Sequence, residues 1–484
     1  MPTACQNAAA THFLHEFWLA LGGQAGDLAQ VQMTGNGALA SIFPVTDFAS
    51  AAIAAAHLAV GELLGQTLGT GPAITVDRRL ASLWFATSLR PLGWELPAQW
   101  DAVAGDYRAG DGWIRLHTNA PHHRQAALAV LKTAPERDAV SQAVLRWQAG
   151  QLERAVVDNQ GCAAAMRSAS AWRDHPQGRA VALEPLLHWL DPGAGPDSAG
   201  NRSSRSSQEQ TVWRGSRERP LQGVRVLDLT RILAGPVATR FLAGLGADVL
   251  RIDPHGWDEP GTVPEVVLGK RCARLDLCDL ADRAVLKRLL SEADVIIHGY
   301  RADALARLGL DADRRRQLNP SLIDISLNAY GWTGPWRARR GFDSLVQMSC
   351  GIAEAGMHAA ASDRPVPLPV QALDHATGYL MAAAAVRGLT QRLNTGRGVQ
   401  VQASLARTAL SLMSCPQPDA SSEAFSPRDA GEFSRRHTAD YATDIEHTAW
   451  GPVHRLKPAG QIEGTPTRWD FPATTLGSAD ASWR

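Results

Sequence analysis

Two aspartates at the start of long apolar stretches are the residues best placed to do covalent chemistry. Asp374 opens the stretch LDHATGYLMAAAAV, and Asp47 lies at the same place in TDFASAAIAAAHLAV. Apolar residues at helical spacing predict a helix after each aspartate. Such an aspartate can cap its helix, or its carboxylate can attack a substrate as a nucleophile. Because a helix N-terminus favours negative charge, the two roles are compatible, and we expect an ionised carboxylate at Asp374.

The segments that follow the two aspartates resemble each other and indicate an internal repeat. Each contains an Ala-rich helix, a Gly turn, a strand and a second helix, which is the signature of a duplicated unit. Aligning Val76 with Val401 leaves 29 residues after Asp47 and 27 after Asp374. The two copies differ next to the acid, since Asp374 is followed by His-Ala-Thr-Gly and Asp47 by Phe-Ala-Ser-Ala. We therefore interpret Asp47 as a surviving helix cap.

Composition limits the kinds of partner. The 484 residues are enough for two or three domains, and the 45% hydrophobic and 20% charged content is typical of a globular protein. Lysine plus arginine equals aspartate plus glutamate, so no global basic field favours nucleic acid or an anionic membrane. No run of about 18 consecutive apolar residues predicts a membrane span; the closest is interrupted by His57 and Glu62.

The six cysteines are scattered, with no CxxC pair and no zinc-ligand spacing. This pattern predicts reduced thiols, no metal site and a cytoplasmic location. The first 23 residues make a poor signal peptide, because they lack a basic start followed by an uninterrupted apolar core.

A Gly-, Pro- and Ser-rich segment divides the chain. It predicts a flexible linker over residues 191–220, between an N-terminal part, 1–190, and an α/β domain, 221–415. Residues 416–484 are expected to form a second linker and a tail that returns to the large domain.

Strand and helix signals alternate in the second part. Short apolar, β-branched runs at 223–229, 248–253, 294–300 and 322–330 are separated by helical patterns. This alternation predicts an α/β fold with a doubly wound parallel, Rossmann-like sheet, which binds ligands at the carboxyl ends of its strands. The turn after the first strand, DLTRILAGP, has no G-x-G-x-x-G, so a dinucleotide is not expected, and Asp253 is interpreted as a strand-end acid.

Seven stretches within residues 223–412 resemble the family III CoA-transferases (the CaiB/BaiF family, with the formyl-CoA and carnitine CoA-transferases) in the family's order. They are RVLDLTRILAGPVATRFLAGLGADVLRIDP, GKRCARLDL, ADVIIHGYRADALARLGLD, LNAYGWTGPW, GFDSLVQMSCG, LDHATGY and TGRGVQVQASL. Residues 107–118 resemble the start of the family's small α+β domain, which normally follows the catalytic domain, and 451–477 resemble its closing segment. We therefore expect a fused, rearranged chain whose N-terminal part supplies the small domain.

The resemblance implies an activity. It implies that Asp374 attacks an acyl-CoA thioester, forms a mixed anhydride and then an aspartyl-CoA thioester, and passes CoA to an acceptor carboxylate. The partners would be an acyl-CoA and a small carboxylic acid, with CoA as a substrate and no tightly bound cofactor. It also implies an interlocked homodimer.

The resemblance also assigns the CoA-binding positions. The turn that would face the thioester is Ile232, Leu233 and Ala234, where free N–H groups could hold an oxyanion; it could also be a plain helix-starting turn. Basic and aromatic positions suited to the adenine and phosphates are Lys270, Arg271, Tyr300, Arg301 and Arg307. Taken one at a time, these cations could equally be solvated surface charges. Gly299 and Tyr300 replace the family's usual Asn-Phe.

Two other activities remain open. The α-methylacyl-CoA racemases share this fold and use a histidine in a GHD motif, where this chain has Gly341-Phe342-Asp343. A phenylalanine cannot exchange a proton, which favours a transferase. A non-catalytic paralogue that binds CoA esters is the third possibility, and the Thr-Gly after Asp374 counts against it.

Overall fold

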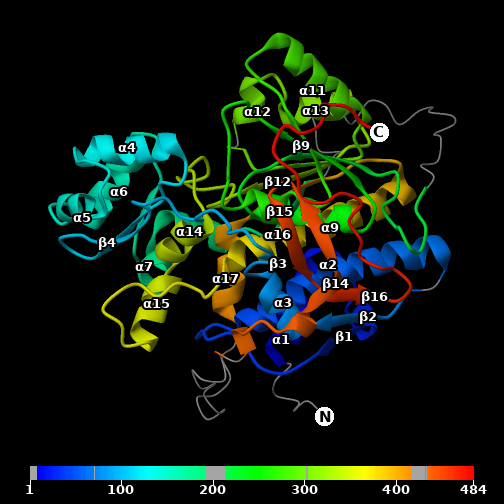
Figure 1. Cartoon of the computed structure of the whole chain (residues 1–484), viewed down its shortest axis with the longest axis horizontal. Helices are drawn as coiled ribbons and strands as arrows, with labels where there is room; N and C mark the ends of the chain where they lie inside the picture. The colour runs from blue at the N-terminus through cyan, green and yellow to red at the C-terminus, as the bar shows by residue number, and fades with distance from the viewer. Residues whose placement is uncertain (1–7, 70, 191–212, 301–302, 416–430, 432) are drawn as a thin grey trace.

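A seven-stranded sheet forms the centre of the computed structural model, which describes residues 8–69, 71–190, 213–300, 303–415, 431 and 433–484 (Figure 1). Its order is β10-β9-β8-β11-β12-β13-β7. The strands are β7 (Leu187–Leu190), β8 (Arg225–Leu229), β9 (Asp248–Asp253), β10 (Arg271–Arg274), β11 (Val295–His298), β12 (Ile323–Asn328) and β13 (Gln400–Ser404). All pair in parallel except β7, which comes from the N-terminal part and is antiparallel to β13. The predicted α/β fold is confirmed.

Alternate residues of these strands enter two different cores, as a sheet covered on both faces requires. Val226, Val249 and Ile297 face one core, while Leu227 and Ile296 face the other. The first face is covered by α9 (Ala234–Gly244), α16 (Ala372–Thr395), α17 (Leu405–Ser414), α1 (Ala8–Ala20) and α2 (Val45–Leu68). The second face is covered by α11 (Leu280–Glu292), with α12 (Ala304–Arg307) and α13 (Ala312–Leu318) beside it (Figure 1).

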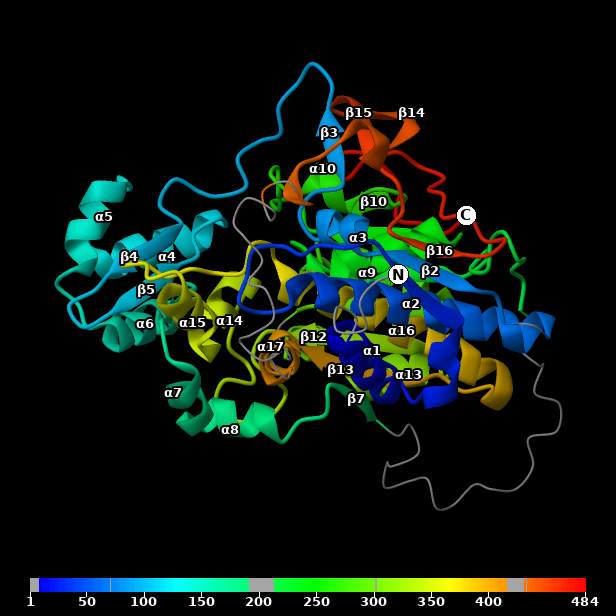
Figure 2. The ribbon, with the colours of Figure 1, turned by 90° about the horizontal axis from the view of Figure 1, so that it is seen from below.

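Helices α2 and α16 pack side by side and match in detail (Figure 2). Each has 24 residues, and their N-cap residues, Pro44 and Gln371, have nearly the same backbone angles (φ −76°, ψ 63° and φ −75°, ψ 62°). Each ends on a left-handed glycine, Gly69 or Gly396. Each of these positions in α2 precedes its counterpart in α16 by the same number of residues.

The same offset continues into the following elements. Asp77 caps α3 (Arg78–Trp84) as Ser404 caps α17. With this offset, Val76 of the first repeat corresponds to Ala403 of the second. The sequence comparison had paired Val76 with Val401, two positions earlier.

The length and composition of α2 would allow it to cross a membrane, with a mean hydropathy of 1.5, although the sequence pattern predicted no such segment. However, 89% of that stretch is buried inside the structure. Core helices pass the same test, and α2 packs between α1 and α16.

A smaller α+β unit lies beside the sheet, at the left of Figure 1. Strands β4 (Gly105–Arg108), β5 (Trp113–Leu116) and β6 (Ala163–Ala165) form an antiparallel sheet covered by α4 (Pro121–Leu131), α5 (Arg137–Val144) and α6 (Ala149–Asp158). The unit has its own core around Tyr107, Ile114 and Leu152. Strands β5 and β6 pack against α14 (Asp343–Cys350), the helix that begins at the aspartate of the GFD motif.

The end of the chain pairs with strands of the N-terminal part. β14 (Tyr441–Thr448) and β15 (Gly451–Leu456) form a sheet with β3 (Leu89–Pro91), and β16 (Gly460–Ile462) adds to β1 (Val31–Thr34) and β2 (Ile74–Asp77). Trp469 and Phe471 then reach α9 and the loop before β10. The remaining helices are α7 (Ala169–Asp174), α8 (Pro176–Ala182), α10 (Val263–Val266), α15 (Ile352–Ala359) and the short 3-10 turns Ala25–Gln30 and Thr438–Asp440.

Candidate functional site

Asp374 lies in the first turn of α16, and a second carboxylate holds that turn in place. Oδ2 of Asp343 accepts the backbone N–H groups of Leu373 (2.9 Å) and Asp374 (3.0 Å). Oδ1 of Asp343 accepts the side-chain amide of Gln347. The predicted cap role of Asp374 is therefore wrong: the N-cap residue is Gln371, without a side-chain cap, and Asp343 of α14 satisfies the free N–H groups from another helix.

The two carboxyl groups are both buried, and each raises the cost of ionising the other. Burial raises the pKa of Asp343 to about 6, although the N–H of Asp374, the amide of Gln347 and the N–H of Leu373 lower it. Burial and the neighbouring Asp343 raise the pKa of Asp374 well above its ordinary 3.8. Asp343 accepts three donors, so it is the better placed of the two to carry the negative charge. Burial and the charge of Asp343 both oppose the ionised Asp374 that the helix N-terminus was expected to favour.

Asp47 has a different neighbour. Its carboxylate forms a buried ion pair with Arg78, the first residue of α3. Burial raises the pKa of Asp47, and Arg78 opposes that shift. The guanidinium compensates the Asp47 charge within the core, whereas Asp374 faces a second carboxylate.

The predicted oxyanion turn, Ile232 to Ala234, lies against the helix that carries Asp374. A Cβ added to Gly378 of α16 would lie 2.4 Å from the carbonyl oxygen of Ala234, so only glycine permits this contact. This approach gives a packing reason for the Thr-Gly after Asp374. Ile232 has a positive φ of 66°, and its N–H donates to the Glu259 carboxylate at 3.0 and 3.1 Å.

The N–H of Ile232 is therefore occupied. In the described part of the chain, the N–H groups of Leu233 and Ala234, where α9 begins, have no acceptor.

Lys270 does not lie where a phosphate could reach it. Its ammonium is fully buried, 2.9 Å from Oδ2 of Asp228 and 3.0 Å from the carbonyl oxygen of Pro236. The assignment of Lys270 to CoA is therefore corrected: this lysine forms a core ion pair below the β8–α9 turn.

The other predicted cations are dispersed. Arg271, in β10, holds the carboxylate of Asp248 in a bidentate pair. Arg307 is exposed and pairs with Asp303 one turn earlier in the chain. Arg301 lies outside the described residues.

Tyr300 lies at the point where the strand order reverses. β8 is the first of the parallel strands in the chain. β9 and β10 lie on one side of it in the sheet, and β11, β12 and β13 lie on the other side. Arg231 follows β8, Tyr300 follows β11, and the guanidinium carbon of Arg231 lies 5.2 Å from the centre of the Tyr300 ring. Trp257 covers the same guanidinium at 4.4 Å.

Arg231 was not among the residues predicted from the sequence, although its place directly after the first predicted strand was a usable signal. Ligands of doubly wound sheets bind at this switch point. The Arg231 side chain is 26% exposed.

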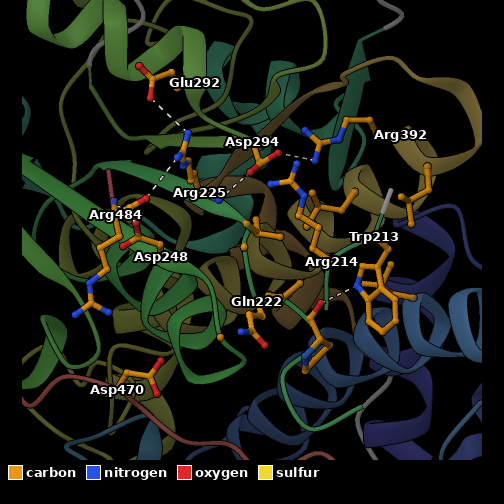
Figure 3. Close-up of a pocket in the computed structure, with 18 residues that line it drawn as sticks. Trp213, Arg214, Gln222, Arg225, Asp248, Glu292, Asp294, Arg392, Asp470 and Arg484 are labelled. Carbon is orange, nitrogen blue, oxygen red and sulfur yellow. Dashed lines mark hydrogen bonds and ion pairs between the residues drawn. The ribbon is translucent and has the colours of Figure 1, made fainter. Parts of the chain in front are cut away.

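A cavity of about 1130 Å³ lies at the other end of the parallel strands, near the amino ends of β8, β9 and β11 (Figure 3). Four of its charged side chains form two ion pairs: Arg225 contacts Glu292 at 3.4 Å, and Arg392 contacts Asp294 at 2.8 Å. None of the predicted site residues that the structure describes lines it. The candidate reaction centre is therefore the Asp343–Asp374 pair and the turn beside it.

Comparison with known proteins shows which family the chain resembles. Residues 221–448 match the model of CoA-transferase family III. A probable fatty acyl-CoA transferase of Mycobacterium tuberculosis, Rv3272, is 32% identical over 49% of this chain and 64% of its own length. The acetyl-coenzyme A transferase nodX of Hypoxylon pulicicidum is 34% identical, over 42% of this chain and 36% of its own length.

The mouse succinyl-CoA:glutarate CoA-transferase is 33% identical over 39% of this chain and 45% of its own length. The chain thus spans less than two thirds of the length of these relatives. A crystal structure of Rv3272 matches 40% of this chain and 57% of that protein, with 32% identity and a TM-score of 0.36.

Proposed function

Residues 221–448 are a CoA-transferase family III domain, and from this we propose that the protein transfers coenzyme A from an acyl-CoA thioester to a carboxylic acid, with Asp374 as the nucleophile. The observation that carries the proposal is the Asp343–Asp374 pair. Asp343 holds the first turn of α16 through two N–H groups and leaves the Asp374 carboxyl without a hydrogen-bond partner in the described part of the chain. A buried carboxyl held in one position and free of partners suits nucleophilic attack.

The reaction would proceed through two covalent intermediates. The carboxylate oxygen of Asp374 attacks the thioester carbonyl, the C–S bond breaks, and CoA thiolate leaves a mixed anhydride. The thiolate then attacks the aspartyl carbonyl and releases the donor carboxylate, leaving an aspartyl-CoA thioester. An acceptor carboxylate reverses these steps and takes CoA. Burial excludes water, which would hydrolyse the anhydride.

The surrounding groups have roles in this scheme. The amides of Leu233 and Ala234, beside α16, are the donors available for the developing oxyanion. Arg231 at the switch point would hold a CoA phosphate, since a guanidinium forms charge-assisted bonds with phosphate oxygens. Tyr300, which lies beside Arg231, would contact the same ligand.

We also propose that the N-terminal part, 1–190, derives from a second copy of the same unit. The matched lengths and caps of α2 and α16 support a repeat. The proposed order is that part, a linker over 191–220, the transferase domain over 221–415, and a tail over 416–484. A homodimer and a cytoplasmic location remain part of the proposal.

The proposal is tested by trapping the intermediate. The protein is incubated with succinyl-CoA, digested, and analysed by mass spectrometry for a CoA adduct on Asp374. The adduct should form in the wild type and in Asp47→Asn, and should be absent in Asp374→Asn. No adduct, together with full CoA-ester exchange by Asp374→Asn, would refute this mechanism. Deuterium incorporation at the α-carbon of a 2-methylacyl-CoA would instead support a racemase, which Phe342 disfavours.

A further inference from the structure

Aromatic rings from both parts of the chain form a continuous wall beside the candidate reaction centre. His117 stacks on Phe342, with ring centres 3.7 Å apart and planes at 9°, and His123 meets the same phenylalanine edge-on at 6.0 Å. The ring centre of His122 lies 4.1 Å from that of His123 and 6.5 Å from that of Trp257. We call His117, His122, His123, Trp257 and Phe342 the ring wall.

The ring wall connects the two ends of the proposed substrate path. At one end, Trp257 covers Arg231 at the switch point. At the other end, Phe342 directly precedes Asp343, which binds the backbone of Asp374. A CoA ester bound to both Arg231 and Asp374 would lie along the ring wall. The three histidines come from the small α+β unit, in the segment that links β5 to the first turn of α4.

The imidazoles at the Asp343 end have an unusual environment. His117 and His123 are each 4% exposed. Within the described residues, Nδ1 of His117 and Nδ1 of His123 have no hydrogen-bond partner. Nε2 of His123 lies 3.6 Å from the Cys162 thiol. Burial lowers the pKa of each to about 3, so both rings are neutral and each can present an N–H donor.

A wall built only to hold an alkyl chain would have aliphatic side chains there, because an unpaired buried nitrogen is unfavourable. Two such nitrogens, on rings that both contact Phe342, indicate that a polar group completes them.

We propose that His117 and His123 determine which acid exchanges CoA, by recognising a hydrogen-bonding group that the acid carries beyond its reacting carboxylate. This inference rests on the proposed transferase function. The class of substrate is a hydroxy acid or a dicarboxylic acid, as opposed to a plain fatty acid. Sites that pair a substrate hydroxyl reject analogues that lack it far more strongly than an apolar pocket rejects an extra methylene.

The test compares acids matched in length. CoA exchange from succinyl-CoA is measured with pentanoate, 5-hydroxypentanoate and glutarate, and with the corresponding sets of four, six and eight carbons. The wild type should prefer a polar member over the plain acid by about tenfold or more in kcat/KM. A preference for the hydroxy acid or for the diacid distinguishes the two kinds of polar group.

Two variants of His117 separate recognition from packing. His117→Phe keeps a ring on Phe342 but removes both nitrogens, and should abolish the preference mainly through the KM of the polar acid. His117→Asn keeps an N–H near the position of Nδ1 and should retain part of the preference. His358→Phe, an exposed histidine of α15, makes the same chemical change away from the wall and should leave the preference unchanged.

Formation of the aspartyl-CoA adduct is measured for each variant, so that a lost transferase and a lost selectivity are distinguished. A wild type that prefers the plain acids would refute the inference. So would a His117→Phe variant that forms the adduct and keeps the wild-type preference, since the nitrogens would then bind only water. Absence of the adduct in the wild type refutes the transferase itself.

Discussion

Oδ2 of Asp343 accepts the backbone N–H of Asp374 at 3.0 Å, so one carboxylate both holds the first turn of α16 and acts electrostatically on the carboxyl beside it. The hydrogen bond fixes the position of Asp374, while the negative charge disfavours its ionisation. Positioning and proton affinity of the proposed nucleophile are therefore linked through a single residue.

The first prediction concerns the pH at which transfer begins. Asp343→Asn keeps an oxygen that can accept the N–H groups of Leu373 and Asp374 but removes the neighbouring charge. The pKa of Asp374 should fall, and the acidic limb of kcat/KM for CoA exchange should move to lower pH. A complete pH profile of the wild type and the variant measures this shift. An unmoved limb in a folded variant would show that burial alone sets the pKa.

The second prediction concerns stability. The pKa of Asp374 is higher in the folded chain than the ordinary 3.8 of an unfolded one, so the folded state binds the proton more tightly. The stabilisation from this bound proton is complete below pH 3.8 and is lost as pH rises through the folded-state pKa. Asp374→Asn removes the titration. The variant should therefore gain stability relative to the wild type as pH rises from about 4 through the folded-state pKa of Asp374, as measured by urea unfolding at each pH.

The third prediction separates the two aspartates. Asp47→Asn leaves the buried Arg78 guanidinium, whose side chain is 5% exposed, without its counter-charge. Breaking such a pair costs about 3–5 kcal/mol. The free energy of unfolding should fall by that amount while CoA exchange per folded molecule is retained. Loss of exchange without loss of stability would give Asp47 a catalytic role.

The fourth prediction concerns the cations. Lys270→Met leaves Asp228 buried and unpaired, and should lower the free energy of unfolding by about 3–5 kcal/mol without changing the KM for acyl-CoA. Arg231→Gln removes a partly exposed guanidinium at the switch point and should raise that KM about tenfold or more, since a charged hydrogen bond contributes about 1.5–3 kcal/mol.

Thermal unfolding and steady-state kinetics of both variants measure these two effects. The opposite result, a raised KM from Lys270→Met alone, would return Lys270 to the ligand site.

The sequence alone determined the elements whose signals are local. Alternating apolar runs predicted β9 over its full range, Asp248–Asp253, and placed β8, β11 and β12 within a few residues. Helical periodicity predicted α2 and α16, and the aspartate in the first turn of each. Ordered motifs indicated the transferase family, and residues 221–448 match the model of that family.

Only the tertiary structure decided which side chains meet. The cap on α16 comes from Asp343, 31 residues before Asp374, and the partner of Lys270 is Asp228, 42 residues away. Hydrogen bonds and ion pairs of this kind leave no periodic trace in the chain, because they form between elements that meet only after the sheet and helices have packed. For the same reason the sequence assigned Lys270 to a ligand and overlooked Arg231: burial, which decides whether a cation is a core partner or a binding group, is a property of the fold.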